Sequence, residues 1–342
     1  MEASSLALVT PASLAAAPVR ALVQSGYGST EVFSVGQRAR PRPGPREVLV
    51  AVKAAGLDRG TWHLMTGRPY LMRVMGFGFS APKQPVPGLD LSGTVVEVGP
   101  DVTRFRVGDE VFGIGQGSFA ELAVASEDKL AKKPSVLSFE EAAVLGISGL
   151  TAIQALTDAG KLARGERVLV IGASGGVGTY LVQIAKALGA HVTAVCSASK
   201  AELVRSLGAD VVLDYRAGDF TTSGERYDLV LDVGGGRPVS HLRRVMTETA
   251  RLVFVGNEHG GDWTAGFGRP LGAMLLAPFV KQRFVMFMSN EHFEGLERLA
   301  AMAEAGQLRA SIDRTVTLEG VASAMQDLEA GKVRGKVVVL PR

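Results

Sequence analysis

The sequence predicts an α/β protein with two lobes, one rich in β-strands and one built on a parallel sheet covered by helices. Its 342 residues are more than a single hydrophobic core usually organises. Up to about Leu145 the chain carries strand patterns, and after it short apolar runs alternate with helical segments. A glycine-rich loop at residues 172–178 joins the first of those runs to a helix.

Three segments of the first part have the pattern of β structure. Glu47–Ala54 alternates in the way of a half-buried strand, Leu91–Val98 follows, and Gly108–Gly113 is a turn that leads into another strand. Clusters of proline and glycine at Pro41–Pro45 and Pro85–Gly88 separate these runs. The first lobe is therefore predicted to be β-rich.

The pattern changes near Phe139, where helical apolar spacing begins and extends to Ala159, with Ser138 as the cap before Glu140 and Glu141. Strands and helices then alternate, which is typical of a parallel sheet covered on both faces. The predicted strands are Val168–Ile171, His191–Cys196, Val211–Leu213, Leu229–Leu231, Leu252–Val255 and Phe284–Met288. The predicted helices are Val177–Leu188 and Lys200–Leu207, followed from Asn290 by Glu294–Ala305, Leu318–Glu329 and a last strand at Lys336–Leu340.

Composition excludes several classes of protein. Apolar residues make up 46% and charged residues 21%, as in soluble globular proteins, and the net charge of +3 comes without a basic run that would follow nucleic acid. The single cysteine, Cys196, rules out an intramolecular disulfide and a multi-cysteine metal site. No window approaches the ~18 apolar residues of a membrane span. Residues 1–18 lack a basic segment and contain Pro11, so we expect a mobile tail and a cytoplasmic protein.

The glycine-rich loop predicts a dinucleotide site because of where it stands. It follows a buried strand, opens a helix, and is followed by a second strand after Gly189. Gly172 permits a tight turn, Gly175 and Gly176 let the backbone approach a pyrophosphate, and Gly178 allows close packing of helix on strand. The helix N-terminus then attracts the anion. The predicted cofactor residues of the loop are Gly172, Ala173, Ser174, Gly175, Gly176, Val177 and Gly178.

The end of the second strand favours NADPH. An NAD site usually has Asp or Glu about 20 residues after the glycines, to accept a hydrogen bond from the ribose 2′-hydroxyl. Here Ser197, Ser199 and Lys200 stand there instead, so two hydroxyls and an ammonium are available to a 2′-phosphate. Tyr215 and Arg216, after the third strand, can add a phenol or a guanidinium.

These motifs resemble those of the medium-chain dehydrogenase/reductases, in their zinc-free, quinone oxidoreductase-like branch. The motifs that carry the resemblance are Gly88–Gly99, Arg106–Gly113, Gly117–Glu121, the loop at 172–178 and Arg334–Val339. The resemblance implies a GroES-like catalytic domain from residues 1–147 and 290–342, with 1–18 as the tail. It also implies a Rossmann NADPH-binding domain at residues 148–289, through which a homodimer forms.

The resemblance also implies further cofactor residues. Thr151 is similar to the family's threonine near the nicotinamide, and Asn257 sits where the chain passes that ring, with His259 close by. Phe287 and Ser289 match a stretch whose backbone meets the carboxamide. Lys336, in the closing motif Arg334–Val339, is assigned to the cofactor site as well.

A catalytic zinc is not expected. The positions that match the ligands of zinc-dependent relatives are Asp58, Leu89-Asp90 and Ile147. Leucine and isoleucine side chains cannot bind a metal, and the remaining carboxylates do not make a tetrahedral nitrogen and sulfur site. No four-cysteine structural site is present in a chain with one cysteine.

Without zinc, the predicted reaction is hydride transfer from NADPH to a small apolar substrate, a quinone or an α,β-unsaturated carbonyl compound. The product oxygen needs a hydrogen-bond donor and the α-carbon needs a proton. Tyr70, His63 and Asp58 are the candidates. The family usually has Asn at Asp58 and Asp at Thr61, and its loop before Tyr70 is one residue shorter, so these roles transfer only loosely.

Two other functions stay open at this stage. One is a carbonyl reductase or alcohol dehydrogenase that works without zinc, because hydride from NADPH can reach C=O as well as C=C. The other is a non-catalytic NADPH-binding protein, because binding and turnover need different residues. Neither nucleic acid nor a membrane is an expected partner.

Overall fold

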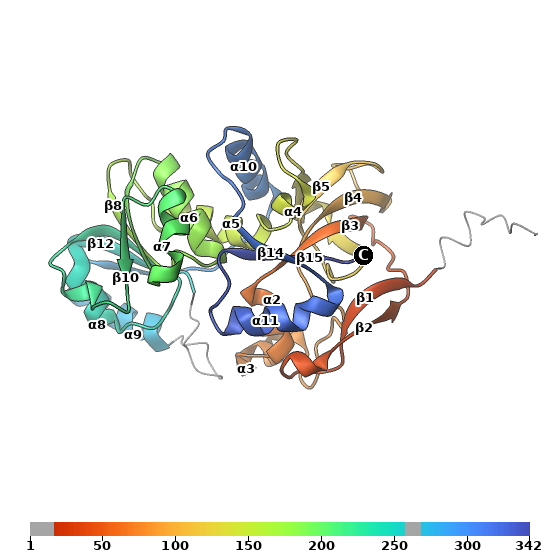
Figure 1. Ribbon diagram of the computed structural model, residues 1–342, viewed down its shortest axis with the longest axis horizontal. Coiled ribbons are helices and arrows are strands. Elements are labelled where there is room, and N and C mark those ends of the chain that lie inside the picture. Colours follow the sequence, from red (N-terminus) through yellow and green to blue (C-terminus); the bar gives the residue numbers. More distant parts are fainter. Residues whose placement is uncertain (1–16, 257–267) are drawn as a thin grey trace, which may run out of the picture.

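A computed structural model describes residues 17–256 and 268–342 of the protein. The predicted tail therefore lies almost entirely outside the described residues, as do Asn257 and His259. Figure 1 shows an elongated molecule with a β-sheet at each end and the helix α5 between them. The predicted fold class is confirmed, since one sheet is parallel and covered by helices and the other belongs to a β-rich lobe.

The first sheet has six parallel strands in the order β10-β9-β8-β11-β12-β13. Its strands are β8 (Arg167–Ile171), β9 (His191–Cys196), β10 (Val211–Asp214), β11 (Tyr227–Asp232), β12 (Met246–Phe254) and β13 (Arg283–Met286). The helices between them are α6 (Gly176–Ala187), α7 (Ala201–Ser206), α8 (Val239–Leu242) and α9 (Gly268–Leu276). Side chains from alternate positions of β8, such as Val168 and Val170, enter one core while Leu169 enters another, so both faces of this sheet are covered.

The second sheet takes strands from both ends of the sequence, in the order β14-β15-β3-β4-β5-β7, with β6 also paired to β3. Its strands are β3 (Glu47–Leu57), β4 (Asp90–Val98), β5 (Glu110–Ile114), β6 (Leu122–Ser126), β7 (Leu130–Lys132), β14 (Ile312–Thr317) and β15 (Lys336–Leu340). The pair Val337 and Leu57 joins β15 to β3. The expected division at residues 147 and 290 stays a prediction, although it separates these two sheets.

Elements without a sequence signal complete this lobe. The hairpin of β1 (Val19–Gln24) and β2 (Phe33–Arg38) forms a sheet of its own, and two short helices, α2 (Arg59–Thr66) and α3 (Tyr70–Met72), follow β3 along the chain. Helices α10 (Phe293–Glu304) and α11 (Val321–Glu329) agree with the predicted ranges to within a few residues.

The helix predicted over residues 139–159 is interrupted. It is divided into α4 (Phe139–Ala142) and α5 (Gly146–Gln154), and its last turn, at residues 155–159, is a π-turn. The predicted cap is confirmed, because Ser138 and Glu141 form a reciprocal capping box. At the start of α5, a Cβ on Gly146 would stand 2.4 Å from Oδ1 of Asp90. Glycine therefore lets the start of α5 approach a buried carboxylate.

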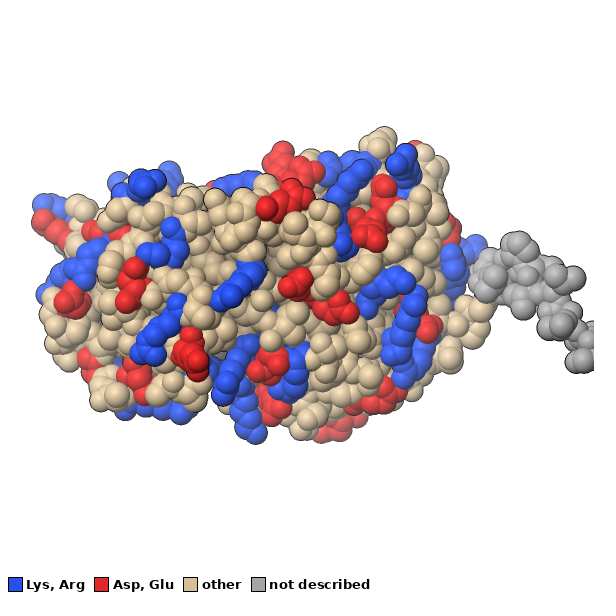
Figure 2. Space-filling model, turned by 45° about the horizontal axis from the view of Figure 1, so that its top comes forward, with Lys and Arg blue, Asp and Glu red and all other residues tan. Residues whose placement is uncertain are grey.

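The two lobes meet along the last strand and the glycine-rich loop. The Gly335 N–H donates to the carbonyl of Ser174 at 2.9 Å, and Gly335 forms a parallel bridge with Gly175. The face drawn in Figure 2 carries acidic and basic side chains in alternation, so it has no continuous charge of one sign. In the described part of the chain, no helix combines the length and the apolar character needed to cross a membrane.

Candidate active site

A cleft of about 630 Å³ lies where the lobes meet. The parallel sheet contributes the glycine-rich loop and the carboxyl ends of β8, β9, β11 and β12, which is where ligands bind in doubly wound folds. The β-rich lobe contributes the end of β3, the start of α2 and residues 331–336, and α5 contributes Ser148 and Thr151. Both lobes therefore supply side chains to one cavity.

The glycine-rich loop has the geometry that its sequence predicts. Gly172 has a φ of +86°, which a side chain would strain, and α6 begins at Gly176 after an extended Gly175. A Cβ on Gly178 would stand 2.2 Å from the Gly172 carbonyl oxygen, so only glycine permits this packing of helix on strand. Gly175 meets nothing closer than 3.6 Å and lines the cleft, so its backbone is open to a ligand.

Positive charge gathers at the far end of the cleft, beyond β9 and β10. Ser197, Lys200, Tyr215 and Arg216 line the cavity there. The Lys200 ammonium donates to the backbone carbonyls of Gly331 (2.8 Å) and Val333 (2.6 Å), which fixes its position.

Burial lowers the pKa of the Lys200 ammonium, and the positive charges of Arg334 and Arg216 act in the same direction against the attraction of Asp313. Lys200 and Arg216 both line this end of the cleft, so it offers cationic groups to a phosphate.

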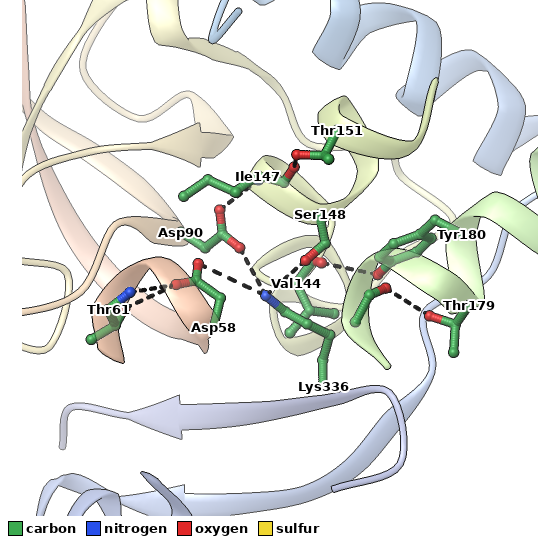
Figure 3. A network of polar contacts seen from close by, with 11 residues as sticks. Asp58, Thr61, Asp90, Val144, Ile147, Ser148, Thr151, Thr179, Tyr180 and Lys336 are labelled. Atoms are coloured by element: carbon green, nitrogen blue, oxygen red, sulfur yellow. Dashed lines mark hydrogen bonds and ion pairs between the residues drawn. The ribbon is translucent and has the colours of Figure 1, made fainter. Parts of the chain in front are cut away.

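The other end of the cleft has a buried polar cluster, formed by Asp58, Asp90, Ser148 and Lys336 and drawn in Figure 3. The Lys336 ammonium lies 3.2 Å from Oδ2 of Asp90, 3.2 Å from the Ser148 hydroxyl and 4.0 Å from Oδ2 of Asp58. All four residues are at least nine-tenths buried. The Lys336 ammonium of β15 thus lies near residues of three other elements, namely the β3–α2 junction, β4 and α5.

The two carboxylates have unequal partners. Asp90 accepts from the Ile147 N–H at Oδ1 (2.8 Å) and from Lys336 at Oδ2. Asp58 caps α2 and accepts at Oδ1 from the N–H (2.8 Å) and hydroxyl (3.1 Å) of Thr61. Its Oδ2 is buried without a hydrogen-bond partner and belongs to a residue that lines the cleft.

Burial raises the pKa of the Asp90 carboxyl to about 7, although the Lys336 ammonium opposes the shift. The charge of Asp58 raises it further, and the Ile147 N–H lowers it. Burial thus disfavours the negative charge of Asp90, and the Lys336 ammonium offsets part of that effect.

The cluster does not fit a catalytic zinc. Asp58, Asp90 and Ile147, which match the ligand positions of zinc-dependent relatives, do converge, but an ammonium lies between the carboxylates and Ile147 offers only a backbone N–H. Within residues 17–256 and 268–342, no three His, Cys, Asp or Glu side chains stand close enough together to hold a metal ion.

The other catalytic candidates are placed unequally. His63 lines the cleft, and its Nδ1 lies 2.7 Å from the carbonyl oxygen of Arg68. The ring of Tyr70 lies 4.8 Å from the Arg73 guanidinium, and Tyr70 does not line the cleft. Asp58 and His63 are therefore the better-placed pair.

The structure brings most of the predicted site residues to the cleft. Those that line it are Asp58, His63, Thr151, Gly172, Ser174, Gly175, Gly176, Val177, Ser197, Lys200, Tyr215 and Lys336. Those that do not are Tyr70, Ala173, Gly178, Ser199, Phe287 and Ser289, while Asn257 lies outside the described residues.

The assignment of Lys336 to the cofactor site stays a prediction. Its aliphatic chain lies beneath Gly176, where a Cβ would meet it at 2.9 Å, and its ammonium contacts Asp90 and Ser148. Sequence reasoning also missed Ser148. Its spacing of three residues from Thr151 on a helix was a usable signal, because it places both on one face.

Two family models match the chain. The model described as "Alcohol dehydrogenase GroES-like domain" matches residues 44–135, and the one described as "Zinc-binding dehydrogenase" matches residues 207–339. The second description does not fit the metal positions above, where Leu89 and Ile147 have no ligating side chain and the two carboxylates lie beside the Lys336 ammonium.

Relatives match over nearly the whole length of the chain. The "Chloroplast envelope quinone oxidoreductase homolog" of Arabidopsis thaliana is 34% identical over 88% of this chain and 92% of its own. The "NAD(P)H oxidoreductase RTN4IP1, mitochondrial" of Bos taurus is 34% identical over 92% of this chain and 87% of its own. Among solved structures, the CurK enoyl reductase has a TM-score of 0.80 at 28% identity, covering 94% of this chain and 99% of that one.

Proposed function

Because the chain belongs to the medium-chain dehydrogenase/reductase superfamily, in its zinc-free quinone oxidoreductase-like branch, we propose that it reduces a quinone or an α,β-unsaturated carbonyl compound with NADPH. The observation that carries the proposal is one cleft that joins an open glycine-rich loop to a buried polar cluster. An oxidoreductase of quinone-reductase type is already established by the relatives. The choice of cofactor and the class of substrate are the proposed parts.

The cleft residues fit a dinucleotide. The N-terminus of α6 and the open backbone of Gly175 suit the pyrophosphate, and Thr151 faces the same cavity from α5 for the nicotinamide. Ser197, Lys200 and Arg216 suit a 2′-phosphate, because no carboxylate lines that end among the described residues. When bound, the cofactor supplies the hydride.

Arg216→Ala is expected to weaken NADPH binding and to leave NADH binding almost unchanged. A guanidinium–phosphate hydrogen bond contributes about 1.5–3 kcal/mol, which corresponds to a rise in Kd of roughly tenfold to a hundredfold. A titration of the protein with each cofactor, followed by nicotinamide fluorescence, measures both Kd values.

Arg205→Ala is the matched control for that variant, because Arg205 is an exposed arginine of α7 that does not line the cleft. Equal losses of NADPH and NADH affinity in Arg216→Ala would contradict the proposal that this end of the cleft binds the 2′-phosphate.

The substrate end of the cleft has polar side chains but, among the described residues, no set of metal ligands. Asp58 and His63 face the cavity beside Ser148 and Thr151, and Lys336 holds positive charge directly behind them. A developing oxyanion is stabilised by such a charge and by hydroxyl donors. This arrangement favours an already activated double bond over a simple alcohol, whose oxidation needs stronger polarisation.

The function is tested with purified protein, NADPH or NADH, and a panel of quinones, enones, aldehydes and ketones, followed at the nicotinamide absorbance band. We expect turnover of quinones or enones with NADPH preferred. Turnover of simple ketones alone would replace the proposal with a carbonyl reductase. Tight NADPH binding without any turnover would indicate a non-catalytic binding protein.

We further propose a homodimer formed through the parallel-sheet lobe. Helix α9 and the segments that follow α9 and the edge strand β13 present apolar side chains to solvent. Among them are Leu275 of α9 (76% exposed), Phe279 shortly after α9 (84%) and Met288 shortly after β13 (84%). Exposed apolar groups in such number are typical of a covered interface. The relatives above carry organelle names, so the expected cytoplasmic location stays a prediction.

A further inference from the structure

The loop at residues 233–237, which follows β11, forms part of the wall of the cleft. Four of its five residues line the cavity, namely Val233, Gly234, Gly236 and Arg237. The loop lies against the glycine-rich loop, because a Cβ on Gly172 would stand 3.2 Å from the backbone nitrogen of Gly234. Consecutive glycines at positions 234–236 give this wall wide conformational freedom of its own. A fixed shape therefore depends on groups outside the loop.

Arg269, the second residue of α9, holds this loop without lining the cleft itself. Its two terminal nitrogens donate to the carbonyl of Gly235 (2.7 Å), to the carbonyl of Arg237 and to Oδ2 of Asp232 (2.8 Å). Asp232 is the fully buried last residue of β11, and its Oδ1 accepts from the Gly235 N–H at 2.9 Å. Both polar backbone groups of Gly235 are therefore held by one guanidinium–carboxylate pair, an arrangement of charge-assisted hydrogen bonds.

The loop held in this way places Arg237 at the far end of the cleft. The Arg237 guanidinium lies 3.1 Å from Oδ1 of Asp219 and 5.2 Å from the ring centre of Phe220. Both partners belong to the segment after β10, and Phe220 lines the cleft together with Arg237. Because the backbone carbonyl of Arg237 is bonded to Arg269, a loop released from Arg269 would also release this guanidinium. Arg269 thus acts on the end of the cleft that lies away from the buried polar cluster.

We propose that Arg269 is a positioning residue of the cofactor site, which holds the 233–237 loop in the shape that a nicotinamide dinucleotide contacts. The inference rests on the proposed function, because that function supplies the ligand of the cleft. It extends the cofactor site to α9, whose Arg269 does not line the cavity. Coupling between two sites is reciprocal, so a bound dinucleotide should in turn stabilise the start of α9.

A purely structural Arg269 would behave differently. If the guanidinium served only to attach α9 to β11, its loss would lower the free energy of unfolding, while the folded protein would bind the cofactor as before. In a positioning role, its loss lets the loop adopt conformations that do not fit the ligand, and the apparent Kd rises as the competent fraction falls. The cofactor affinity of the folded protein therefore separates the two roles.

Arg269→Lys is the first test. Lysine keeps a positive charge beside Asp232, but one ammonium does not reproduce the planar fork that joins two carbonyls and a carboxylate. The Kd for NADPH and the Kd for NADH should each rise by about tenfold, as the loss of one or two hydrogen bonds implies. Arg243→Lys is the matched control, because Arg243 is also a half-buried arginine of this lobe but donates to the Gln282 side chain (2.8 Å) instead of the loop. Its Kd values should equal those of the wild-type protein.

A second variant keeps the test decisive if Arg269→Lys does not fold. In the double variant Arg269→Met with Asp232→Asn, neither charge of the buried pair remains, and the asparagine oxygen can still accept from the Gly235 N–H. Circular dichroism verifies that the variant is folded, and its Kd for either cofactor should again rise by about tenfold or more. An unchanged Kd in a folded variant overturns the positioning role.

Hydrogen exchange measures the coupling of α9 to the cleft. In the free protein, amides of residues 233–237 should exchange faster in Arg269→Lys than in the wild-type protein, because opening of the loop is easier. Saturating NADPH should slow exchange in α9 of the wild-type protein and have little effect on α9 of Arg269→Lys. Exchange in wild-type α9 that is the same with and without NADPH contradicts the coupling.

Steady-state kinetics complete the test. In Arg269→Lys the KM for the cofactor should rise by about tenfold while kcat stays within about twofold, because the loop acts away from the buried polar cluster and its loss removes uniform binding. A fall in kcat at an unchanged KM overturns the positioning role. A wild-type protein that binds neither NADPH nor NADH overturns the proposed function and the inference together. Wild-type binding with unchanged Kd values in the folded variants overturns the inference alone.

Discussion

Gly178→Ala is expected to lower the free energy of unfolding by about 2–3 kcal/mol and to abolish NADPH binding. The new methyl group would stand 2.2 Å from the Gly172 carbonyl oxygen and 2.7 Å from atoms of Ala173, all of them backbone. Backbone cannot rotate away as a flexible side chain can, so α6 must move off β8, and overpacking of this kind is costly. Urea denaturation and a fluorescence titration with NADPH measure the two effects.

Gly175→Ala is the matched control in the same loop. Its methyl group would meet nothing closer than 3.6 Å, and its φ of −85° suits alanine, so the free energy of unfolding should change by less than about 0.5 kcal/mol. NADPH binding should still weaken, because the methyl group covers backbone that faces the cleft. The interpretation fails if Gly178→Ala is as stable as Gly175→Ala.

Lys336→Met is expected to destabilise the protein by about 3–5 kcal/mol near neutral pH. Removal of one partner from a buried ion pair leaves the other charge uncompensated, and here two carboxylates would remain. Lys332→Met, four residues earlier, removes an exposed lysine paired with Asp327 at 3.4 Å and should cost at most about 1 kcal/mol. Chemical denaturation of both variants gives the comparison.

The pH dependence of that loss has a definite sign. The pKa of Asp90 is raised in the folded protein from 3.8 to about 7, so ionisation of this group opposes folding. The destabilisation caused by this ionisation is absent below a pH of about 4, grows as the pH rises, and is complete above a pH of about 7. Lys336→Met removes the ammonium that limits this destabilisation. The free energy of unfolding of the variant should therefore be closest to that of the wild-type protein at acidic pH. A loss that grows on acidification would refute this account.

The sequence was sufficient for those parts of the site that depend on neighbouring residues. The turn at Gly172 and the capping box at Ser138 depend on residues a few positions away, and both are found as expected. Ser197 and Lys200 line the cleft because they directly follow a strand that ends there.

The buried cluster could not be predicted in the same way. Its central contact joins Lys336 to Asp90 across 246 residues, and no local pattern connects β15 with β4. Lys336 was assigned to the cofactor site through the closing motif alone, and that motif does not indicate its contact with Asp90. The interruption at residues 143–145 was missed as well, because apolar spacing does not reveal the buried carboxylate that α5 approaches.

The place of β15 in the second sheet has a consequence for biosynthesis. All six strands of the parallel sheet lie between residues 167 and 286, so that sheet can assemble while the chain is still being made. In contrast, β3 acquires its partner β15 only after every other strand has left the ribosome. Until then Asp58 and Asp90 have no ammonium between them, so the parallel sheet can form before the buried cluster is complete.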